Sequence, residues 1–258
     1  MLSEALIPEW DAASCIGALM TTRRGGVSGP PWDGLNLGLA SGDQPRCVEE
    51  NRRLLAAATG AQPVYLRQVH GRDVVRIDAV SLTAPPPDAD AAWTDVPGIA
   101  CAVQVADCLP VLFAAPLGRA VAAAHAGWRG LAAGVLESTV HALCEGAGCD
   151  AGALVAWLGP CIGRREFEVG ADVLQAFGAP VAAADQPCFR FQPRSGGQLR
   201  WRADLAGLAR ERLRALGLQR VSGGGWCTVE DRSRFFSYRR DGITGRMVAA
   251  AWIRSPSG

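Results

Sequence analysis

The segment Val105–Gly130 constrains the fold more than any other part of the chain, because it holds apolar runs separated by turn-forming residues. Leu109–Ala115 is one such run, and a Pro-Leu-Gly turn separates it from the run Ala120–Ala124. Short apolar runs bounded by Pro and Gly are typical of buried strands. The segment therefore predicts neighbouring buried strands, with Cys108 directly before one of them and His125 at the end of the next.

Three side chains that can bind a metal accompany these strands. Another strand-like run, Val64–Val69, ends at His70, so His70, Cys108 and His125 are all expected at strand ends. Two imidazoles and a thiolate, with a fourth position open, make a ligand set typical of catalytic zinc. Copper is an alternative occupant, because it binds N and S ligands more tightly than zinc does. The spacings of 38 and 17 residues match no compact metal motif, so packing as buried side chains remains an alternative.

Cys108 also supports a hypothesis that involves no metal. It could act as a nucleophile with His125 as its base, which would make the protein a cysteine hydrolase. A zinc-bound thiolate is a poorer nucleophile, so the two hypotheses compete for one sulfur atom. Asp107 could orient a histidine or accept a proton, or equally serve as a turn residue that bonds its own backbone. Asp88 and Asp90 have the same two interpretations, and their proline-rich surroundings favour the turn.

The number of histidines restricts redox chemistry. The chain has three histidines, and the helical periodicity of Leu131–Glu145 places His141 on the polar face of that helix. A four-copper oxidase centre needs many more imidazole ligands than the two that remain. We therefore expect no laccase activity of the multi-copper kind.

The chain contains no lysine, so its 26 basic residues are all arginine. This excludes a Walker A phosphate loop, a pyridoxal phosphate Schiff base and a lysine general base. Arginine, backbone N–H groups or a metal must then bind any phosphate. The candidates for binding an anionic substrate group are Arg129, Arg240 and Arg246. Aromatic residues at 235, 236 and 238, together with Trp128, could stack on a purine or simply pack.

The apolar pattern predicts an α+β fold with mixed β-sheets and flanking helices, because strands outnumber helices and do not alternate with them regularly. Expected strands are Ile16–Met20, Tyr65–Gln68, Val74–Ile77, three between Ile99 and Ala124, Ala153–Leu158, Trp226–Val229 and Met247–Ile253. Expected helices run from a cap at Asp43 to Gly60, over Leu131–Glu145, over Val169–Phe177 and from a cap at Asp204 to Gly217. No linker or repeat divides residues 1–258, so we predict a single domain.

The composition indicates in which cell compartment the protein is expected and which kinds of partner are not expected. The nine cysteines are odd in number and form no CxxC pair, which favours reduced thiols in a cytoplasm. The start of the chain lacks a basic region followed by an apolar core, so no signal peptide is expected. A net charge of +1 provides no general attraction to nucleic acid or to a membrane surface.

Several segments resemble the signature blocks of the YfiH family, once described as laccase-domain proteins or polyphenol oxidases. The blocks that carry the three candidate ligands are Arg67–Gly71, Ala106–Pro110 and His125–Gly130. The resemblance continues in the expected order over nearly the whole chain, at Thr21–Arg23, Gly25–Ser28, Leu35–Gly38, Asp88–Asp90, Gly159–Gly163 and Phe235–Gly242. It implies one YfiH-like domain with α/β/β/α layers, and a metal site at His70, Cys108 and His125.

The resemblance also implies a function in purine nucleoside metabolism. Family members are described as phosphorylases of adenosine, inosine and guanosine, with methylthioadenosine phosphorylase and adenosine deaminase activities. The partners would then be a nucleoside and phosphate, with no nucleic acid, membrane or protein partner. An editing hydrolase that removes a misincorporated amino acid from a peptidoglycan precursor is the main alternative. A copper-binding polyphenol oxidase and a non-enzymatic metal-binding protein are two further ones.

Overall fold

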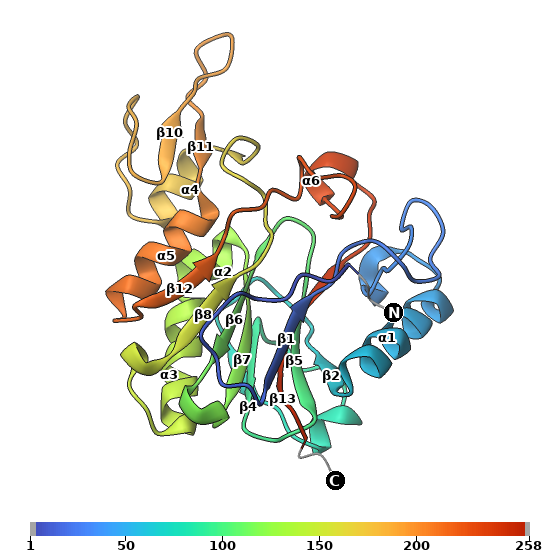
Figure 1. The fold of residues 1–258 in the computed structure, drawn as a ribbon. Helices are drawn as coiled ribbons and strands as arrows, with labels where there is room; N and C mark the ends of the chain where they lie inside the picture. The colour runs from blue at the N-terminus through green and yellow to red at the C-terminus, as the bar shows by residue number, and fades with distance from the viewer. Residues whose placement is uncertain (1–3, 256–258) are drawn as a thin grey trace.

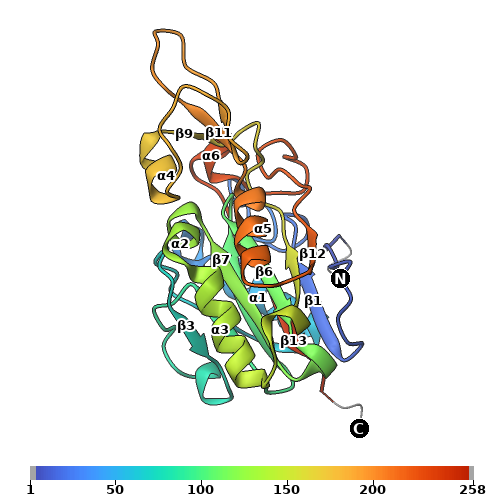
Figure 2. The same ribbon diagram turned by 90° about the vertical axis from the view of Figure 1, so that its left-hand side faces the viewer.

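The computed structural model describes residues 4–255, and its main body is formed by two β-sheets packed face to face with helices on both outer faces. Figures 1 and 2 show this α/β/β/α arrangement, with α1 outside one sheet and α3 and α5 outside the other. Both sheets mix parallel and antiparallel pairs. The predicted α+β class and its layering are therefore confirmed. Within residues 4–255, no helix combines the length and the apolar character needed to cross a membrane.

The larger sheet has six strands in the order β12-β8-β6-β7-β4-β3. Their bounds are Arg220–Gly223, Val155–Leu158, Leu109–Ala114, Val121–Ala126, Ala91–Thr94 and Val74–Arg76. The smaller of the two main sheets has the order β1-β13-β5-β2. Its bounds are Ile16–Met20, Met247–Ile253, Ile99–Val105 and Gln62–Tyr65.

Alternation along β6 and β7 explains why their sequences are apolar throughout. Leu109 and Val111 on β6 pack under the outer helices, whereas Leu112 packs between the two sheets. Side chains of a strand alternate between its faces, so a strand covered on both sides is apolar at every position. On β7, His125 stands between Ala124 and Ala126, which both face the helices, so its side chain points to the layer between the sheets.

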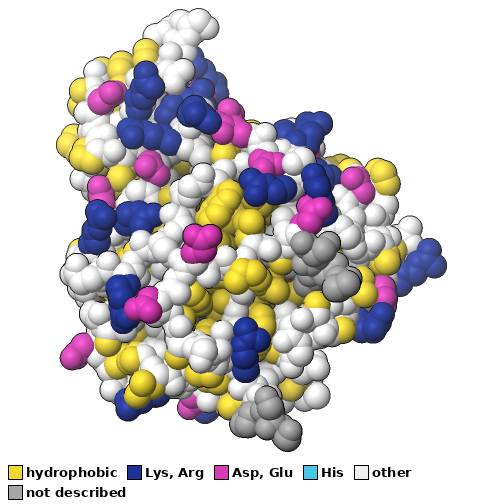
Figure 3. Space-filling model, viewed as in Figure 1, with side chains coloured by type: hydrophobic (Ala, Val, Ile, Leu, Met, Phe, Trp, Pro, Cys, Tyr) yellow, Lys and Arg dark blue, Asp and Glu magenta, His cyan; other side chains and the backbone are white. Residues whose placement is uncertain are grey.

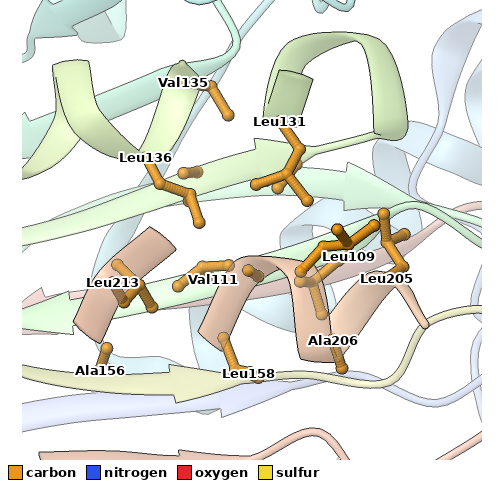
Figure 4. Packing of buried hydrophobic residues seen from close by; sticks show 14 of the residues in the cluster. Leu109, Val111, Leu131, Val135, Leu136, Ala156, Leu158, Leu205, Ala206 and Leu213 are labelled. Atoms are coloured by element: carbon orange, nitrogen blue, oxygen red, sulfur yellow. The ribbon is translucent and has the colours of Figure 1, made fainter. Parts of the chain in front are cut away.

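The helices cover the outer faces. α1 (Pro45–Thr59) packs on the four-stranded sheet, while α2 (Trp128–Ala133), α3 (Val135–Ala147) and α5 (Leu205–Ala215) pack on the six-stranded one. Figure 4 shows Leu109 and Val111 of β6 meeting Leu131, Leu136 and Leu213 from three different helices. Each such leucine, once fully buried, contributes about 1.5–3 kcal/mol. Asp204 accepts a hydrogen bond from the Gly207 N–H, which confirms the predicted N-cap of α5.

A small three-stranded sheet stands apart from the main layers, with α4 (Ala171–Ala176) beside it (Figure 2). Its order is β10-β11-β9, with the bounds Phe189–Phe191, Trp201–Ala203 and Glu168–Val169. Basic side chains gather over it in Figure 3. The remaining short elements are α6 at Tyr238–Asp241 and 3₁₀ turns at Leu39–Ser41, Val80–Leu82, Pro116–Gly118 and Ala151–Ala153.

The predicted helix Leu131–Glu145 is two helices. Gly134 separates α2 from α3 with a left-handed φ of 98°, and its N–H closes the end of α2 on the carbonyls of Gly130 and Leu131. The apolar stripe continues across this break, so periodicity alone does not reveal it. His141 lies on the solvent side of α3, as predicted, with a side chain 85% exposed.

The strand predicted at Tyr65–Gln68 is wrong in position, because β2 ends at Tyr65. Beyond that residue the Gln68 side chain takes over the pairing with β5. Its amide donates to the Gln104 carbonyl at 2.9 Å, and its oxygen accepts from the Gln104 N–H at 2.8 Å. A carboxamide presents the same donor and acceptor as a peptide group, so it can replace one rung of backbone pairing. The backbone before His70 is therefore free to leave the sheet.

Other predicted elements also differ from the structure. Trp226–Val229 is not a strand and supplies only an isolated bridge between Cys227 and Cys161, while β12 lies earlier in the chain. Val169 belongs to β9, so α4 begins two residues later. Asp43 does not cap α1, because its carboxylate accepts from Ser28 Oγ and Asn36 Nδ2 instead.

Candidate metal centre and active site

Three different connections bring His70, Cys108 and His125 together. His70 lies in the loop after β2, Cys108 lies between β5 and β6, and His125 lies on β7. Cys108 and His125 are therefore at strand ends, as predicted, whereas His70 is five residues beyond β2. The three ligand atoms all lie within 4.8 Å of one another, and they form a group that could hold a metal ion.

The chemistry and spacing of this group fit zinc. With Zn–N near 2.0 Å and Zn–S near 2.3 Å, a tetrahedral site separates nitrogen from sulfur by roughly 3.6 Å. His70 Nε2 lies 3.8 Å from Cys108 Sγ. The two imidazole rings meet edge to face with their centroids 4.8 Å apart, so their nitrogens converge without stacking. Two imidazoles and one thiolate occupy three positions and leave a fourth for an exogenous ligand.

Two glycines after β7 make room for this convergence. A Cβ on Gly127 would lie 3.0 Å from both Cys108 Sγ and His70 Cδ2, and one on Gly130 would lie 2.7 Å from the Gly71 carbonyl oxygen. Side chains at these positions would push the ligands apart or displace the loop that carries His70. The absence of side chains at Gly127 and Gly130 therefore leaves the space in which the candidate ligands converge.

Asp90 contacts both histidine segments. Its carboxylate accepts a hydrogen bond from His125 Nδ1 at 2.8 Å, and it also accepts from the backbone N–H groups of Val69, His70 and Gly71. The bond to Nδ1 leaves Nε2 of His125 as the nitrogen free for a metal. Burial opposes ionisation of Asp90, but the bonds from His125 and from the loop outweigh it and lower its pKa.

The electrostatics of the group favour a thiolate beside imidazolium. Burial opposes ionisation of Cys108, but the charge and hydrogen bonds of His125 and His70 outweigh it and lower the pKa of the thiol to about 6. Burial likewise disfavours the charged form of His125, yet Cys108 and Asp90 raise its pKa to about 9. A thiolate at neutral pH is the form that binds a metal.

We expect iodoacetamide to modify Cys108 of the metal-stripped protein with a half-maximal rate near pH 6. Only the thiolate reacts, and its fraction rises as the pH passes the pKa of the thiol, which for an ordinary cysteine is about 8.5. Mass spectrometry after brief exposure between pH 5 and pH 9 measures the profile. Cys101 is the internal control, because burial raises the pKa of its thiol. A half-maximal rate above pH 8 at Cys108, or equal modification of Cys101, contradicts this expectation.

Within the described part of the chain, Asp107 forms hydrogen bonds with the surrounding loops and does not bond to a histidine. Its carboxylate accepts from Thr228 Oγ1 at 2.5 Å and from the Arg239 N–H at 2.7 Å, and its carbonyl accepts from the Ile162 N–H. The residue has a φ of 99°, which is uncommon without glycine. These bonds fix the turn that presents Cys108. Asp88, in contrast, pairs with Arg67 at the surface.

A cavity of about 440 Å³ opens on the three ligands. Its volume lies in the range of small-molecule sites, roughly 300–1,000 Å³. Leu66, Val105 and Ala106 provide apolar wall, while the polar lining includes Gln104 and Arg246. Tyr238 also lines the cavity, and the residue is 60% exposed.

The three arginines proposed for anion binding lie in different surroundings. Only Arg246 lines the cavity. Arg129 is exposed and stacks over the Trp128 ring, with its guanidinium carbon 4.3 Å from the ring centre. Arg240 donates to the carbonyls of Thr228, Val229 and Phe235 and pairs with Asp241, so its guanidinium holds a loop together. Of the aromatic candidates, Phe235 and Phe236 are buried in the core.

The sequence alone did not indicate the structural roles of Gln68, Gln104 and the two glycines. For Asp90 it favoured a turn residue over a residue that orients a histidine. Gln68 stands two residues before His70, which is a weak signal of its role in ending β2. The role of Asp90 depends on contacts with residues 19 to 35 positions away. No local pattern reports such contacts.

Comparisons with known proteins agree with this architecture. The family model described as multi-copper polyphenol oxidoreductase laccase matches residues 17–254. A purine nucleoside phosphorylase of Pseudomonas aeruginosa is 49% identical over 249 residues, which cover 96% of this chain and 98% of that protein. The purine nucleoside phosphorylase YfiH of Escherichia coli is 45% identical over 254 residues, which cover 98% of this chain and 100% of that protein.

Solved structures lead to the same family. A Neisseria meningitidis protein of the DUF152 family is 44% identical and superimposes with a TM-score of 0.87, covering 97% of this chain and 99% of the other. The residues that the family model matches, 17–254, include His70, Cys108 and His125. The chain therefore belongs to the YfiH (DUF152) family, whose family model is described as multi-copper polyphenol oxidoreductase laccase.

Proposed function

We propose that this protein is a zinc-dependent purine nucleoside phosphorylase of the cytoplasm. Its substrates are adenosine, inosine and guanosine, and it also has methylthioadenosine phosphorylase and adenosine deaminase activity. One observation supports this most strongly. His70, Cys108, His125 and Arg246 all line the same cavity, so a metal ligand set and a cation for an oxyanion share one cavity. Relatives named purine nucleoside phosphorylase support the substrate class.

The reaction transfers a glycosyl group to phosphate. An oxygen of phosphate bonds to C1′ of the ribose while the bond from C1′ to the purine nitrogen breaks. The bonding pair leaves with the base, which takes up a proton, and ribose 1-phosphate is the other product. A zinc ion at the three ligands would supply Lewis acidity to an oxygen in the cavity.

Arg246 is suited to hold the phosphate. Its guanidinium forms no salt bridge within residues 4–255, and it donates only to the carbonyls of Thr244 and Gly245. Burial lowers its pKa, although the nearby Cys108 and Asp107 oppose that effect. A half-buried cation without a carboxylate partner favours an anionic ligand, because charge-assisted bonds strengthen where water is excluded.

The reaction is tested by incubating the pure protein with inosine, with and without phosphate, and following free hypoxanthine by chromatography. Phosphorolysis predicts release that depends on phosphate, with one ribose 1-phosphate for each base. Release that ignores phosphate would mean hydrolysis. No release from inosine, adenosine or guanosine would reject the proposal and favour an editing hydrolase.

Replacing Arg246 with leucine is expected to raise the KM for phosphate at least tenfold. A charge-assisted hydrogen bond contributes about 1.5–3 kcal/mol, and 1.4 kcal/mol corresponds to a factor of ten in affinity. Initial rates at saturating inosine and varied phosphate measure the effect. Arg129→Leu is the matched control, because Arg129 lies outside the cavity lining. An increased KM for inosine with an unchanged KM for phosphate would assign Arg246 to the nucleoside instead.

A further inference from the structure

We infer that Asp90 is the positioning residue that assembles the metal site, by fixing His70 and His125 to one carboxylate before any metal binds. The inference rests on the metal-binding role of the group and is independent of the substrate. It goes beyond the ligand set, because Asp90 is not one of the three ligands.

The Asp90 carboxylate is saturated by four donors. Its Oδ1 accepts from the His70 N–H at 3.0 Å and from His125 Nδ1 at 2.8 Å. Its Oδ2 accepts from the Val69 N–H at 3.1 Å and from the Gly71 N–H at 2.6 Å. The backbone contributes as well, since the His125 N–H donates to the Asp90 carbonyl at 2.7 Å. One residue thus bonds to both the strand that carries one ligand and the loop that carries another.

The loop has the shape of an anion-binding backbone nest. Successive N–H groups of Val69, His70 and Gly71 all point at the Asp90 carboxylate. His70 has a φ of 60°, in the left-handed region that a residue with a side chain rarely adopts. Such concave runs of N–H groups bind anions, and here the anion is a side chain of the protein. The carboxylate therefore stabilises the backbone conformation that aims His70 at Cys108.

Water cannot take the place of this carboxylate. Asp90 is 0% exposed, so donors that lose it are left without a partner at considerable cost. Asparagine has nearly the same shape but only one acceptor oxygen, and its NH₂ group would face two of the four donors. Asp90→Asn is therefore a small change in volume and a large change in hydrogen bonding.

The same bonds connect the metal site to the wall of the cavity. Leu66, Arg67, Gln68 and His70, all from this loop, line the cavity. Gln68 fixes the loop to β5 at one end, and Asp90 fixes it at the other. A loop held at both ends keeps its shape without a metal, so we expect the site to be preorganised.

Zinc affinity is the first measurement. Competition with a chromophoric chelator should show that Asp90→Asn binds zinc roughly 10- to 100-fold more weakly than the wild type, the range for loss of a group that orients a ligand. Asp88→Asn is the matched control, because Asp88 lies two residues away and pairs with Arg67 at the surface. Its affinity should stay within about twofold of the wild type. Equal affinities for Asp90→Asn and the wild type would overturn the inference.

Limited proteolysis separates local positioning from general damage. The chain has no lysine, so trypsin cuts only after arginine, and the exposed Arg67 and Arg72 flank His70. With metal removed, Asp90→Asn should be cut after Arg67 or Arg72 at least tenfold faster than the wild type. The rate after exposed Arg194, in the loop between β10 and β11, should not change. Equal cutting of the His70 loop in both proteins would show that Asp90 does not hold it.

A measurement on the unmutated protein keeps the inference testable if Asp90→Asn fails to fold. Nitrogen NMR of the zinc-loaded protein reports which ring nitrogen of each of the three histidines carries a proton. We expect Nδ1 of His125 to be protonated and Nε2 to have the shift of a metal ligand. A metal-bound Nδ1 at His125 would overturn the inference, because that nitrogen could not then donate to Asp90.

Discussion

Cys108→Ala and His125→Ala are each expected to lower phosphate-dependent release of hypoxanthine from inosine by a factor of about 10³ or more. In the proposed function His70, Cys108 and His125 act as one unit around a shared metal, so loss of one of them removes the function of all three. For the same reason the double variant should be hardly worse than either single one. Rates of base release at saturating inosine and phosphate, measured for all three variants, test both statements.

The chain offers matched controls for these variants. His141→Ala removes an exposed histidine of α3, and Cys15→Ala removes an exposed thiol, so both should retain the rate of the wild type. Circular dichroism shows whether each variant is folded. A folded Cys108→Ala or His125→Ala protein that keeps a tenth of the wild-type rate would contradict the assigned role.

Cys108→Ser is expected to abolish stable zinc binding. Wild-type protein purified without added metal should contain about one zinc per chain, and the serine variant less than about a tenth of that after dialysis. Serine removes the thiolate, which provides the only negative charge among the three ligands, and replaces it with a neutral and harder oxygen. Inductively coupled plasma mass spectrometry gives zinc and copper contents in the same sample.

Two results would contradict this prediction. Equal zinc in the wild type and in Cys108→Ser would show that the thiolate is not a ligand. Four coppers per chain, with phenol oxidation at an enzymatic rate, would contradict the argument from three histidines. Cys15→Ser is the matched control, because it makes the same chemical change at an exposed position and should keep the full zinc content.

The local pattern was sufficient where an element is decided by its own residues. β1 and β13 have the predicted bounds Ile16–Met20 and Met247–Ile253. A short apolar run between turn residues is typical of a buried strand. Asp204 caps α5 as predicted, because a cap depends on bonds to residues within one turn. The fold class follows from the number and order of such elements.

The pattern failed where a distant side chain competes with the backbone. Gln68 replaces a rung of β-pairing through contacts with Gln104, 36 residues away, and this ends β2 early. Gly134 divides a predicted helix although glycine inside a helix costs only about 1 kcal/mol, so the local preference was too weak to reveal the break. The first difference arises from a long-range side-chain contact, and the second arises from the left-handed backbone that Gly134 adopts.

Local chemistry and alternation along β6 and β7 were enough to predict Cys108 and His125 as candidate ligands at strand ends. Contacts between distant segments were needed to show that His70 reaches them through a left-handed turn and that Asp90 bonds to both histidine segments. Such contacts also place Arg246, but not Arg129 or Arg240, in the cavity lining. Hydrophobic periodicity reports which face of an element is buried, whereas a site of a few ångströms is set by how separate elements pack against one another.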